Sequence, residues 1–372
     1  MQQLKADAAA TVGLQRMSEG GTVWTRWPML RGRAPADWAM FAQVLRDKGK
    51  TDDALDLALA VLDHPECGGR ARVMASRVLH KDVPSWHWGL VRDSVRNKAY
   101  EAALRRVVGP DSLVLDIGAG TGLLSLLALR AGAGRVIACE MNPAVARMAM
   151  AIARTNGVED RLTIIPKNSA ELVLGEDIDR PVDVIVSEIV DNMLLGEHTL
   201  AVHRDVVPRL LRRGGSVIPA EGRILAALGY DPILESRRMG SHEGFDLSAF
   251  NRIASPSHRI KVGDPGVRLM SDVACLYDFR FDEPDSWGGT AAERSVVAEA
   301  GEANTIIQWM RIDLDRSGAA DAVYEVRPKP GASSCWAAVS WPLVRPIRLQ
   351  AGERHAIAAV RTDATLTVWL AG

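Results

Sequence analysis

The sequence has little of what several classes of protein require. Its 372 residues hold only four cysteines (Cys67, Cys139, Cys275 and Cys335), with no CxxC pair and no histidine at metal-ligand spacing. We therefore expect no disulfide framework, no bound metal and a reduced, cytoplasmic protein. The N-terminus lacks the apolar stretch of a signal peptide, and no apolar run approaches the ~18 residues that cross a membrane. We expect no membrane partner.

The sequence also lacks an excess of charge of either sign. Forty-five basic side chains balance forty-six acidic ones, which leaves a formal net charge of −1. A nucleic-acid partner bound by phosphate neutralisation is therefore not expected. Apolar residues make up 47% and charged residues 24%, the mixture of a globular protein. The length favours two or three domains.

Residues 1–80 have helical periodicity. Apolar residues recur at spacings of three and four through Trp38, Leu45 and Leu59, with an interruption near Gly49. Trp38, Ala42, Gly49 and Ala54 also match the offsets of one tetratricopeptide repeat. A single repeat cannot bury its apolar face without neighbours, so an ordinary helical hairpin remains an equal alternative.

Residues 81–220 alternate short apolar runs with helical stretches, which predicts an α/β fold with a doubly wound parallel sheet. The expected strands are 112–117, 136–139, 162–165, 182–186 and 215–218, with helices at 123–131 and 143–155. From 221 to 372 the helical pattern fades. Apolar runs at 223–228, 273–281, 305–314, 336–339 and 356–370 predict an antiparallel, barrel-like domain. Segment 229–265 is polar and irregular, and we consider it a possible docking arm.

A glycine-rich turn follows the first expected strand. Gly118, Gly120 and Gly122 come directly after Asp116 and Ile117, and glycine permits both positive φ angles and a close backbone approach to a ligand. We expect Asp116 and the three glycines to bind a cofactor. Glu140 ends the next strand, where a carboxylate accepts hydrogen bonds from ribose hydroxyls. Glu171 is a candidate acceptor for an adenine amino group. Dinucleotide sites prefer the longer GxGxxG, so we favour S-adenosylmethionine over a nicotinamide cofactor, and we add Met141 and Ala170, neighbours of Glu140 and Glu171, to its site.

Two glutamates lie nine residues apart after the fourth expected strand. Glu188 follows residues 182–186, and Glu197 comes after a glycine-containing loop. Two carboxylates that converge match the planar donor fork of a guanidinium, each charge-assisted bond contributing about 1.5 to 3 kcal/mol. The pattern therefore predicts methyl transfer to a guanidine nitrogen, with both glutamates binding the acceptor and acting as catalytic residues.

From about residue 84 to its C-terminus, the chain resembles the protein arginine methyltransferase family. The segment from Ser187 to Glu197 is similar to the double-glutamate loop of that family, and residues 114–122 are similar to its first motif. His87, Asp93, Arg96 and Tyr100 have the spacing of its His/Asp/Arg signature. The resemblance implies a class I S-adenosylmethionine-dependent fold, Arg96 on the cofactor carboxylate, and His87 either in a proton relay with the catalytic Asp93 or stacked on the ligand. It also implies a homodimer, for which segment 229–265 is a candidate arm.

Departures from the family motifs affect the substrate side. Asp191 stands where dimethylating members have glycine, as in the monomethylating and symmetric branches. Trp86 and Trp88 replace an aromatic N-terminal cluster, and we expect Trp88 to touch the substrate. Val339-Ser340-Trp341 is taken to replace the Thr-His-Trp loop, which makes Trp341 a second substrate-binding candidate.

Some bacterial relatives with an N-terminal helical extension methylate free arginine for natural products such as streptozotocin, and the chain resembles that kind. The expected reaction is therefore conversion of free L-arginine to Nω-methyl-L-arginine. Two alternatives stay open. One is a protein substrate carrying arginine, and the other is an interaction protein with a degenerate methyltransferase fold.

Overall fold

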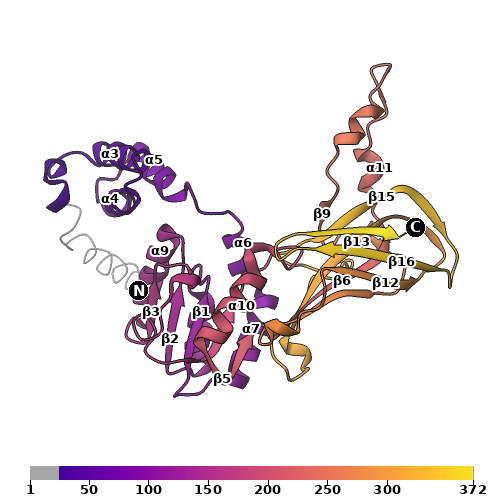
Figure 1. The fold of residues 1–372 in the computed structure, drawn as a ribbon. Coiled ribbons are helices and arrows are strands. Elements are labelled where there is room, and N and C mark those ends of the chain that lie inside the picture. The colour runs from indigo at the N-terminus through magenta and orange to yellow at the C-terminus, as the bar shows by residue number, and fades with distance from the viewer. Residues whose placement is uncertain (1–24, 372) are drawn as a thin grey trace.

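A computed structural model describes residues 25–371 of the chain. The part of the expected N-terminal helical region before residue 25 lies outside the described residues. Figure 1 shows three parts along the chain: a small helical bundle, an α/β unit and a β-rich C-terminal unit from which a narrow arm projects. Within residues 25–371, no helix has the length and apolarity needed to span a membrane.

The bundle packs three amphipathic helices around one apolar core. Its helices are α3 (Pro35–Asp47), α4 (Thr51–Asp63) and α5 (Gly69–His80), preceded by the short helix η1 (Pro28–Leu30). Trp38 and Ala42 of α3 are buried against Ala54 and Ala58 of α4. The expected helices are thus present, whereas their assignment to a tetratricopeptide repeat stays a prediction.

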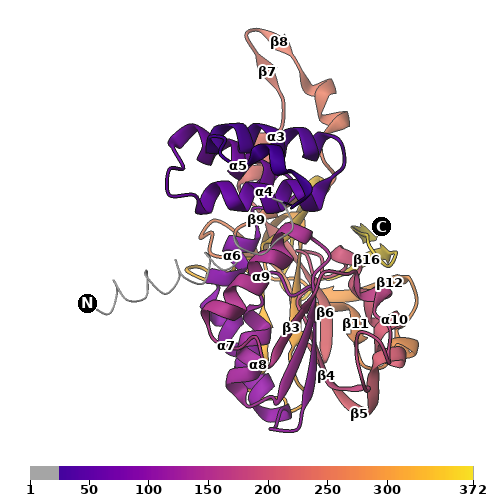
Figure 2. The ribbon, with the colours of Figure 1, turned by 90° about the vertical axis from the view of Figure 1, so that its left-hand side faces the viewer.

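Salt bridges and a hydrogen bond hold the bundle on the α/β unit. Arg147 of α9 (Pro143–Thr155) lies 2.8 Å from Asp56 and 2.9 Å from Asp52, both on α4. The side-chain amide of Asn142 donates to the carbonyl of Asp82, just beyond α5, at 2.6 Å. Figure 2 shows the bundle lying directly above this part of the α/β unit.

The α/β unit is built on five parallel strands in the order β3-β2-β1-β4-β5. These are β1 (Leu113–Ile117), β2 (Arg135–Cys139), β3 (Leu162–Ile165), β4 (Val182–Ser187) and β5 (Leu211–Ile218). The flanking helices are α6 (His87–Arg92), α7 (Ser94–Val107), α8 (Leu123–Ala131), α9 and α10 (Thr199–Leu210). Strand order reverses between β1 and β4, and ligands of such sheets bind at this switch point, beyond the carboxyl ends of the strands.

The C-terminal unit is antiparallel. One sheet has the order β10-β6-β13-β15-β9, with β11 added to β6 and β14 added to β13, and a second has the order β12-β16-β17. The strands are β6 (Glu221–Tyr230), β9 (His258–Ile260), β10 (Arg268–Leu269), β11 (Ala274–Arg280), β12 (Ala291–Val297), β13 (Gly301–Asp313), β14 (Val323–Glu325), β15 (Ala338–Leu349), β16 (Arg354–Arg361) and β17 (Leu366–Ala371). The short helices η5 (Pro284–Ser286) and η6 (Ala320–Ala322) connect them.

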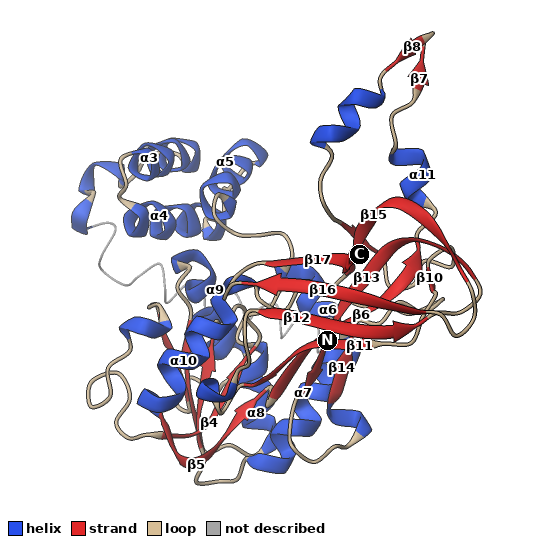
Figure 3. Cartoon of the chain, turned by 45° about the vertical axis from the view of Figure 1, so that its right-hand side comes forward, coloured by secondary structure: helices blue, strands red, loops and turns tan. Residues whose placement is uncertain are grey.

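The arm leaves this unit after β6 and returns at β9. It contains α11 (Ile233–Arg237), β7 (Ser241–His242), β8 (Phe245–Asp246) and η4 (Ser248–Ile253). In Figures 1 and 3 it extends well away from the sheets. Phe245 is 72% exposed and Ile253 is 73% exposed, so the arm presents apolar side chains at its surface.

The parallel sheet followed by antiparallel strands confirms the predicted α/β class, and six of the seven expected α/β elements have the predicted bounds within one residue at each end. Two expectations in the C-terminal unit are wrong. The run 356–370 forms two strands, β16 and β17, because Asp363 and its neighbours make a turn. Trp336 precedes β15 and lies in a loop.

Candidate active site

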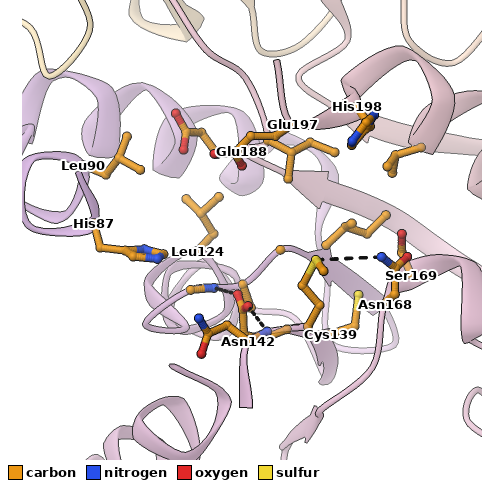
Figure 4. Close-up of a pocket in the computed structure, with 18 of the residues that line it drawn as sticks. His87, Leu90, Leu124, Cys139, Asn142, Asn168, Ser169, Glu188, Glu197 and His198 are labelled. Carbon is orange, nitrogen blue, oxygen red and sulfur yellow. Dashed lines mark hydrogen bonds between the residues drawn. The ribbon is translucent and has the colours of Figure 1, made fainter. Parts of the chain in front are cut away.

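A pocket of about 720 Å³ opens at the carboxyl ends of β1, β2, β3 and β4. In Figure 4, Glu188 and Glu197 lie along one margin of it, and Cys139 and Asn142 lie along the opposite margin. Its wall also includes the segment before and within α6, which contributes Pro84, Trp86 and His87. Its volume falls in the range of small-molecule sites.

The glycine turn forms the floor beside β1. Gly118 and Gly120 line the pocket with φ values of +67° and +57°. A Cβ at Gly118 would lie 2.7 Å from Cγ2 of Ile189, so both backbone conformation and space require glycine there. Gly122 adopts φ +77° as the N-cap of α8 and is not one of the lining residues. Gly122 therefore shapes the turn through its backbone conformation and does not face the ligand.

Glu140 is oriented at the end of β2 by two backbone amides. Gly120 N donates to Oε2 at 2.9 Å, and Asn142 N donates to Oε1 at 2.7 Å. Burial raises the pKa of this carboxyl, and the two hydrogen bonds oppose that effect. Each oxygen keeps acceptor capacity for the hydroxyls of a bound ribose.

Asp116 lies behind the turn and is fully buried. Its Oδ2 accepts a hydrogen bond from Ser125 Oγ at 2.6 Å, and burial raises its pKa to about 6. It is not one of the residues that line the pocket. The structure therefore places Asp116 as a support of the glycine turn, not as a direct contact to the cofactor.

The expected adenine end of the pocket needs one correction. Met141 and Ala170 line the pocket, as do Asn168 and Ser169. Glu171 does not, because its Oε2 accepts from Asn168 N at 3.0 Å in a capping box that closes η2 (Ser169–Glu171). The carboxylate of Glu171 therefore serves the backbone of its own turn and is not among the groups that face the pocket.

Glu188 is anchored by two donors from distant parts of the chain. Its side chain is 5% exposed, Arg96 Nη2 lies 3.2 Å from Oε2, and Trp336 Nε1 donates to Oε1 at 3.0 Å. Burial raises the pKa of Glu188, while the charge of Arg96 opposes that effect. Arg96 is itself buried, and its Nε has no hydrogen-bond partner among the described residues. A buried, incompletely paired guanidinium that lines the pocket fits the carboxylate of S-adenosylmethionine.

Glu197 lies in a strained loop that returns to the pocket. Leu194, Glu197 and His198 adopt φ values of +74°, +54° and +62°, a conformation that costs non-glycine residues energy and clusters at functional sites. Burial, then the charges of Glu188, Asp191 and Glu140, raise the pKa of Glu197 to about 7. The charge of Glu188 acts on Glu197, and both glutamates line the same pocket.

Asp191 shapes the same loop. Its Oδ1 accepts hydrogen bonds from Met193 N at 2.9 Å and from Gly196 N at 3.0 Å. A Cβ at Gly196 would lie 2.4 Å from the Asp191 side chain, so the acidic residue and the glycine fit each other. The Asp191 carboxylate therefore holds the turn between Glu188 and Glu197.

His87 and Asp93 do not form the proton relay that was one of the two roles open for His87. His87 lines the pocket beside Gly120, packs against Trp86 in a tilted arrangement with 3.9 Å between the ring centroids, and has a pKa lowered by burial. Asp93 caps α7 and accepts from Arg96 N at 3.0 Å. Its other oxygen accepts from the Tyr324 hydroxyl and from Cys335 N. No hydrogen bond between His87 and Asp93 occurs among residues 25–371, which leaves the His87 ring, at the wall of the pocket, available to stack on a ligand.

Neither tryptophan predicted for the substrate site lies there. Trp88 is 49% exposed and packs edge-on against His80, because α6 turns it away from the face that carries His87. Trp341 is buried within β15, paired opposite Ile306 of β13. Trp336, from the loop Ser334–Ala337 before β15, instead donates a hydrogen bond to Glu188. Trp336 and Trp341 both follow a serine within two residues, but Trp336 lies in the loop before β15 and Trp341 lies inside that strand.

Replacement of Gly118 by alanine should weaken cofactor binding. The positive φ and the contact with Ile189 each oppose a Cβ, and strain of about 1 to 3 kcal/mol corresponds to a loss of roughly 5- to 150-fold in affinity. Isothermal titration with S-adenosylmethionine measures this. Gly157→Ala is the matched control, since Gly157 has φ +64° but open space around it. Equal affinities for the two variants would contradict the placement of the cofactor.

The fold and site define a class I methyltransferase that uses S-adenosylmethionine. Residues 101–218 match the family model described as ribosomal protein L11 methyltransferase (PrmA). The chain is 33% identical over 295 residues to an arginine N(omega)-methyltransferase of Streptomyces achromogenes subsp. streptozoticus, which covers 79% of this chain and 80% of that protein. It is 32% identical over 252 residues to protein arginine N-methyltransferase 7 of Oryza sativa subsp. indica, which covers 62% of this chain and 35% of that protein.

Two solved structures share the fold. The Trypanosoma brucei PRMT1 enzyme-prozyme heterotetrameric complex with AdoHcy aligns with a TM-score of 0.67 and 24% identity, over 77% of this chain and 94% of that chain. Arabidopsis thaliana protein arginine methyltransferase 10 aligns with a TM-score of 0.61 and 17% identity, over 73% of this chain and 86% of that chain. The chain belongs to the arginine methyltransferase family, as its 33% identity to the Streptomyces enzyme over 80% of that protein shows.

Proposed function

We propose that this enzyme methylates the guanidine nitrogen of free L-arginine to give Nω-methyl-L-arginine, in the biosynthesis of a natural product. The observation that carries the guanidine acceptor is the convergence of Glu188 and Glu197 on the cofactor pocket. Free arginine is favoured because the similarity to the Streptomyces arginine N(omega)-methyltransferase extends over 80% of that protein. The match to the rice protein arginine N-methyltransferase covers only 35% of its length.

The two glutamates have different electrostatic surroundings, which gives them different tasks. Glu188 is tied to Arg96 and Trp336, so its orientation is set before substrate arrives. A preorganised carboxylate of this kind holds a guanidinium in place and directs one nitrogen toward the reacting methyl group. Arg96 and Glu140 would hold the carboxylate and ribose of S-adenosylmethionine, which supplies an electrophilic methyl group when bound.

Glu197 is suited to take up the proton that the reaction releases. When the new C–N bond forms and the C–S bond breaks, the guanidinium nitrogen must lose a proton. The pKa of Glu197 is raised to about 7, so its carboxylate is a better base than an ordinary glutamate. Glu188, which has a buried cation beside it, keeps its charge while Glu197 accepts the proton.

Mass spectrometry of parallel reactions tests the substrate. The enzyme is offered free L-arginine in one tube and an Arg/Gly-rich peptide in another, each with S-adenosylmethionine. We expect a single methyl group on free arginine and none on the peptide. Methylation of the peptide alone would overturn the assignment and favour the second candidate function, methylation of arginine within a protein.

The partners follow from the same proposal. We propose a homodimer formed through the arm, whose exposed apolar side chains include Phe245, Phe250 and Ile253. We also propose a cytoplasmic location, in keeping with the four free cysteines of the described chain. The single tetratricopeptide-like repeat remains our proposal for the bundle, in which α5 covers the apolar face of α3 and α4.

A further inference from the structure

A buried tyrosine connects the β-rich unit to the loop that carries Trp336. Tyr324 lies on β14, opposite Ile312 of β13, and is 3% exposed. Its hydroxyl donates to Asp93 Oδ2 at 2.6 Å and also hydrogen bonds with Ser334 Oγ. Tyr324 thus joins the N-cap of α7, in the α/β unit, to the start of the loop Ser334–Ala337.

Three successive backbone amides of this loop are held by side chains. Cys335 N donates to Asp93 Oδ2 at 2.9 Å, and Trp336 N donates to Ser334 Oγ at 3.0 Å. Ala337 N donates to Asn192 Oδ1 at 2.7 Å. Since Asn192 belongs to the loop that carries both glutamates, this arrangement fixes Trp336 against Glu188. Tyr324 contacts two of the three acceptor groups, Asp93 and Ser334.

The charge states of the cluster are defined by the same contacts. Burial opposes ionisation of Asp93, but hydrogen bonds from Arg96 N, Tyr324 and Cys335 N outweigh it and lower its pKa. Burial raises the pKa of Tyr324, so its hydroxyl remains a donor. An ionised acceptor with a neutral hydroxyl donor is one of the stronger hydrogen bonds in proteins.

We propose that Tyr324 is a positioning residue for methyl transfer, whose hydroxyl sets the loop Ser334–Ala337 so that the Trp336 indole donates to Glu188. The inference rests on the proposed function, since Glu188 is the group being oriented. Tyr324 does not line the pocket and acts through Trp336. Loss of the hydroxyl releases Asp93 and Ser334 from one shared partner and lets the indole drift from the carboxylate. A displacement of about 1 Å at such a position costs up to roughly 100-fold in rate.

The test compares Tyr324→Phe with Tyr277→Phe. Tyr277 is also a buried tyrosine of the β-rich unit, but its hydroxyl donates to Thr290 O and Ala359 O, far from the glutamates. We expect Tyr324→Phe to lower kcat by about 10- to 100-fold without a change in S-adenosylmethionine affinity, and Tyr277→Phe to keep the wild-type kcat. Trp336→Phe should lower kcat similarly, and the double variant should lose little more than Trp336→Phe alone. If the kcat of the double variant falls by the product of the two single losses, the two residues act independently and the proposal is overturned.

A second measurement does not depend on turnover. In protein labelled with ¹⁵N-tryptophan, the Trp336 indole N–H signal is assigned from its absence in Trp336→Phe. We expect that signal to shift in Tyr324→Phe and to stay in place in Tyr277→Phe. If the Trp336 indole signal does not move in Tyr324→Phe, Tyr324 does not position Trp336, whatever the substrate is. If the wild-type enzyme methylates neither arginine nor peptide, the proposed function fails instead, and the indole signal still decides the role of Tyr324.

Discussion

Glu188→Gln should lower kcat by about 10²- to 10³-fold and leave the affinity for S-adenosylmethionine nearly intact. Glutamine keeps the shape of the side chain but removes the charge that draws a guanidinium to the reacting methyl group. Arg96 loses its protein counter-charge in this variant, yet the carboxylate of the cofactor can take over that pairing. Stopped assays with radiolabelled methyl donor give kcat, and calorimetry gives the cofactor affinity.

Stability is the control for this variant. Removing one partner of a buried ion pair costs up to about 3–5 kcal/mol, so the melting temperature is measured with S-adenosylhomocysteine bound. Glu101→Gln serves as the matched substitution, because Glu101 of α7 pairs with Arg105 of the same helix and with Arg130 of α8, and it does not line the pocket. A Glu188→Gln protein that is folded, binds cofactor and turns over at the wild-type rate would remove Glu188 from the mechanism.

Glu197→Gln should lower kcat strongly and abolish the low-pH limb of the rate profile. The pKa of Glu197 is raised to about 7, so in the free enzyme its carboxylate forms as the pH rises through that value. The wild-type kcat/KM should therefore increase up to about pH 7 and then level off. A cationic substrate favours the carboxylate, so the corresponding limb in kcat lies at lower pH. If the low-pH limb of the kcat/KM profile is unchanged in Glu197→Gln, the titration belongs to a group other than Glu197.

The same substitution should stabilise the fold above neutral pH. The folded-state pKa of Glu197 lies above the ordinary glutamate value of 4.5, so ionisation is less favourable in the folded protein than in the unfolded one. Its contribution to stability is therefore complete below about pH 4.5 and is lost as the pH rises through about 7. Glutamine cannot ionise, so Glu197→Gln should melt at a higher temperature than the wild type at pH 8. A lower melting temperature of Glu197→Gln at pH 8 would contradict the unfavourable ionisation of Glu197 beside the other carboxylates.

Sequence patterns predicted the parts of the molecule whose geometry is set locally. The glycines after β1 and the glutamate after β2 lie at the ends of buried parallel strands, and the ends of such strands meet at one sheet edge. Glu188 and Glu197 were predictable for the same reason, because β4 neighbours β1 and the intervening loop returns to the pocket. The order of the strands and the spacing along one loop are sufficient to predict the position of those residues.

The errors fall where a side chain has two available partners or where distant strands meet. Glu171 follows Asn168 at capping-box spacing. Its carboxylate hydrogen bonds to the nearby backbone, whereas we expected it to bind a ligand. Trp341 lies inside β15 and Trp336 lies in the loop before it, and a single sequence does not reveal that this strand begins at Ala338. The partnership of Asp93 with Tyr324 spans 231 residues, and nothing near either residue signals it.

A crystal structure with S-adenosylhomocysteine and L-arginine would test the paired glutamates most directly. The account predicts that the guanidinium lies within hydrogen-bond reach of both Glu188 and Glu197, with one nitrogen facing the sulfur. An arginine held elsewhere in the pocket, with its guanidinium away from both carboxylates, would contradict it.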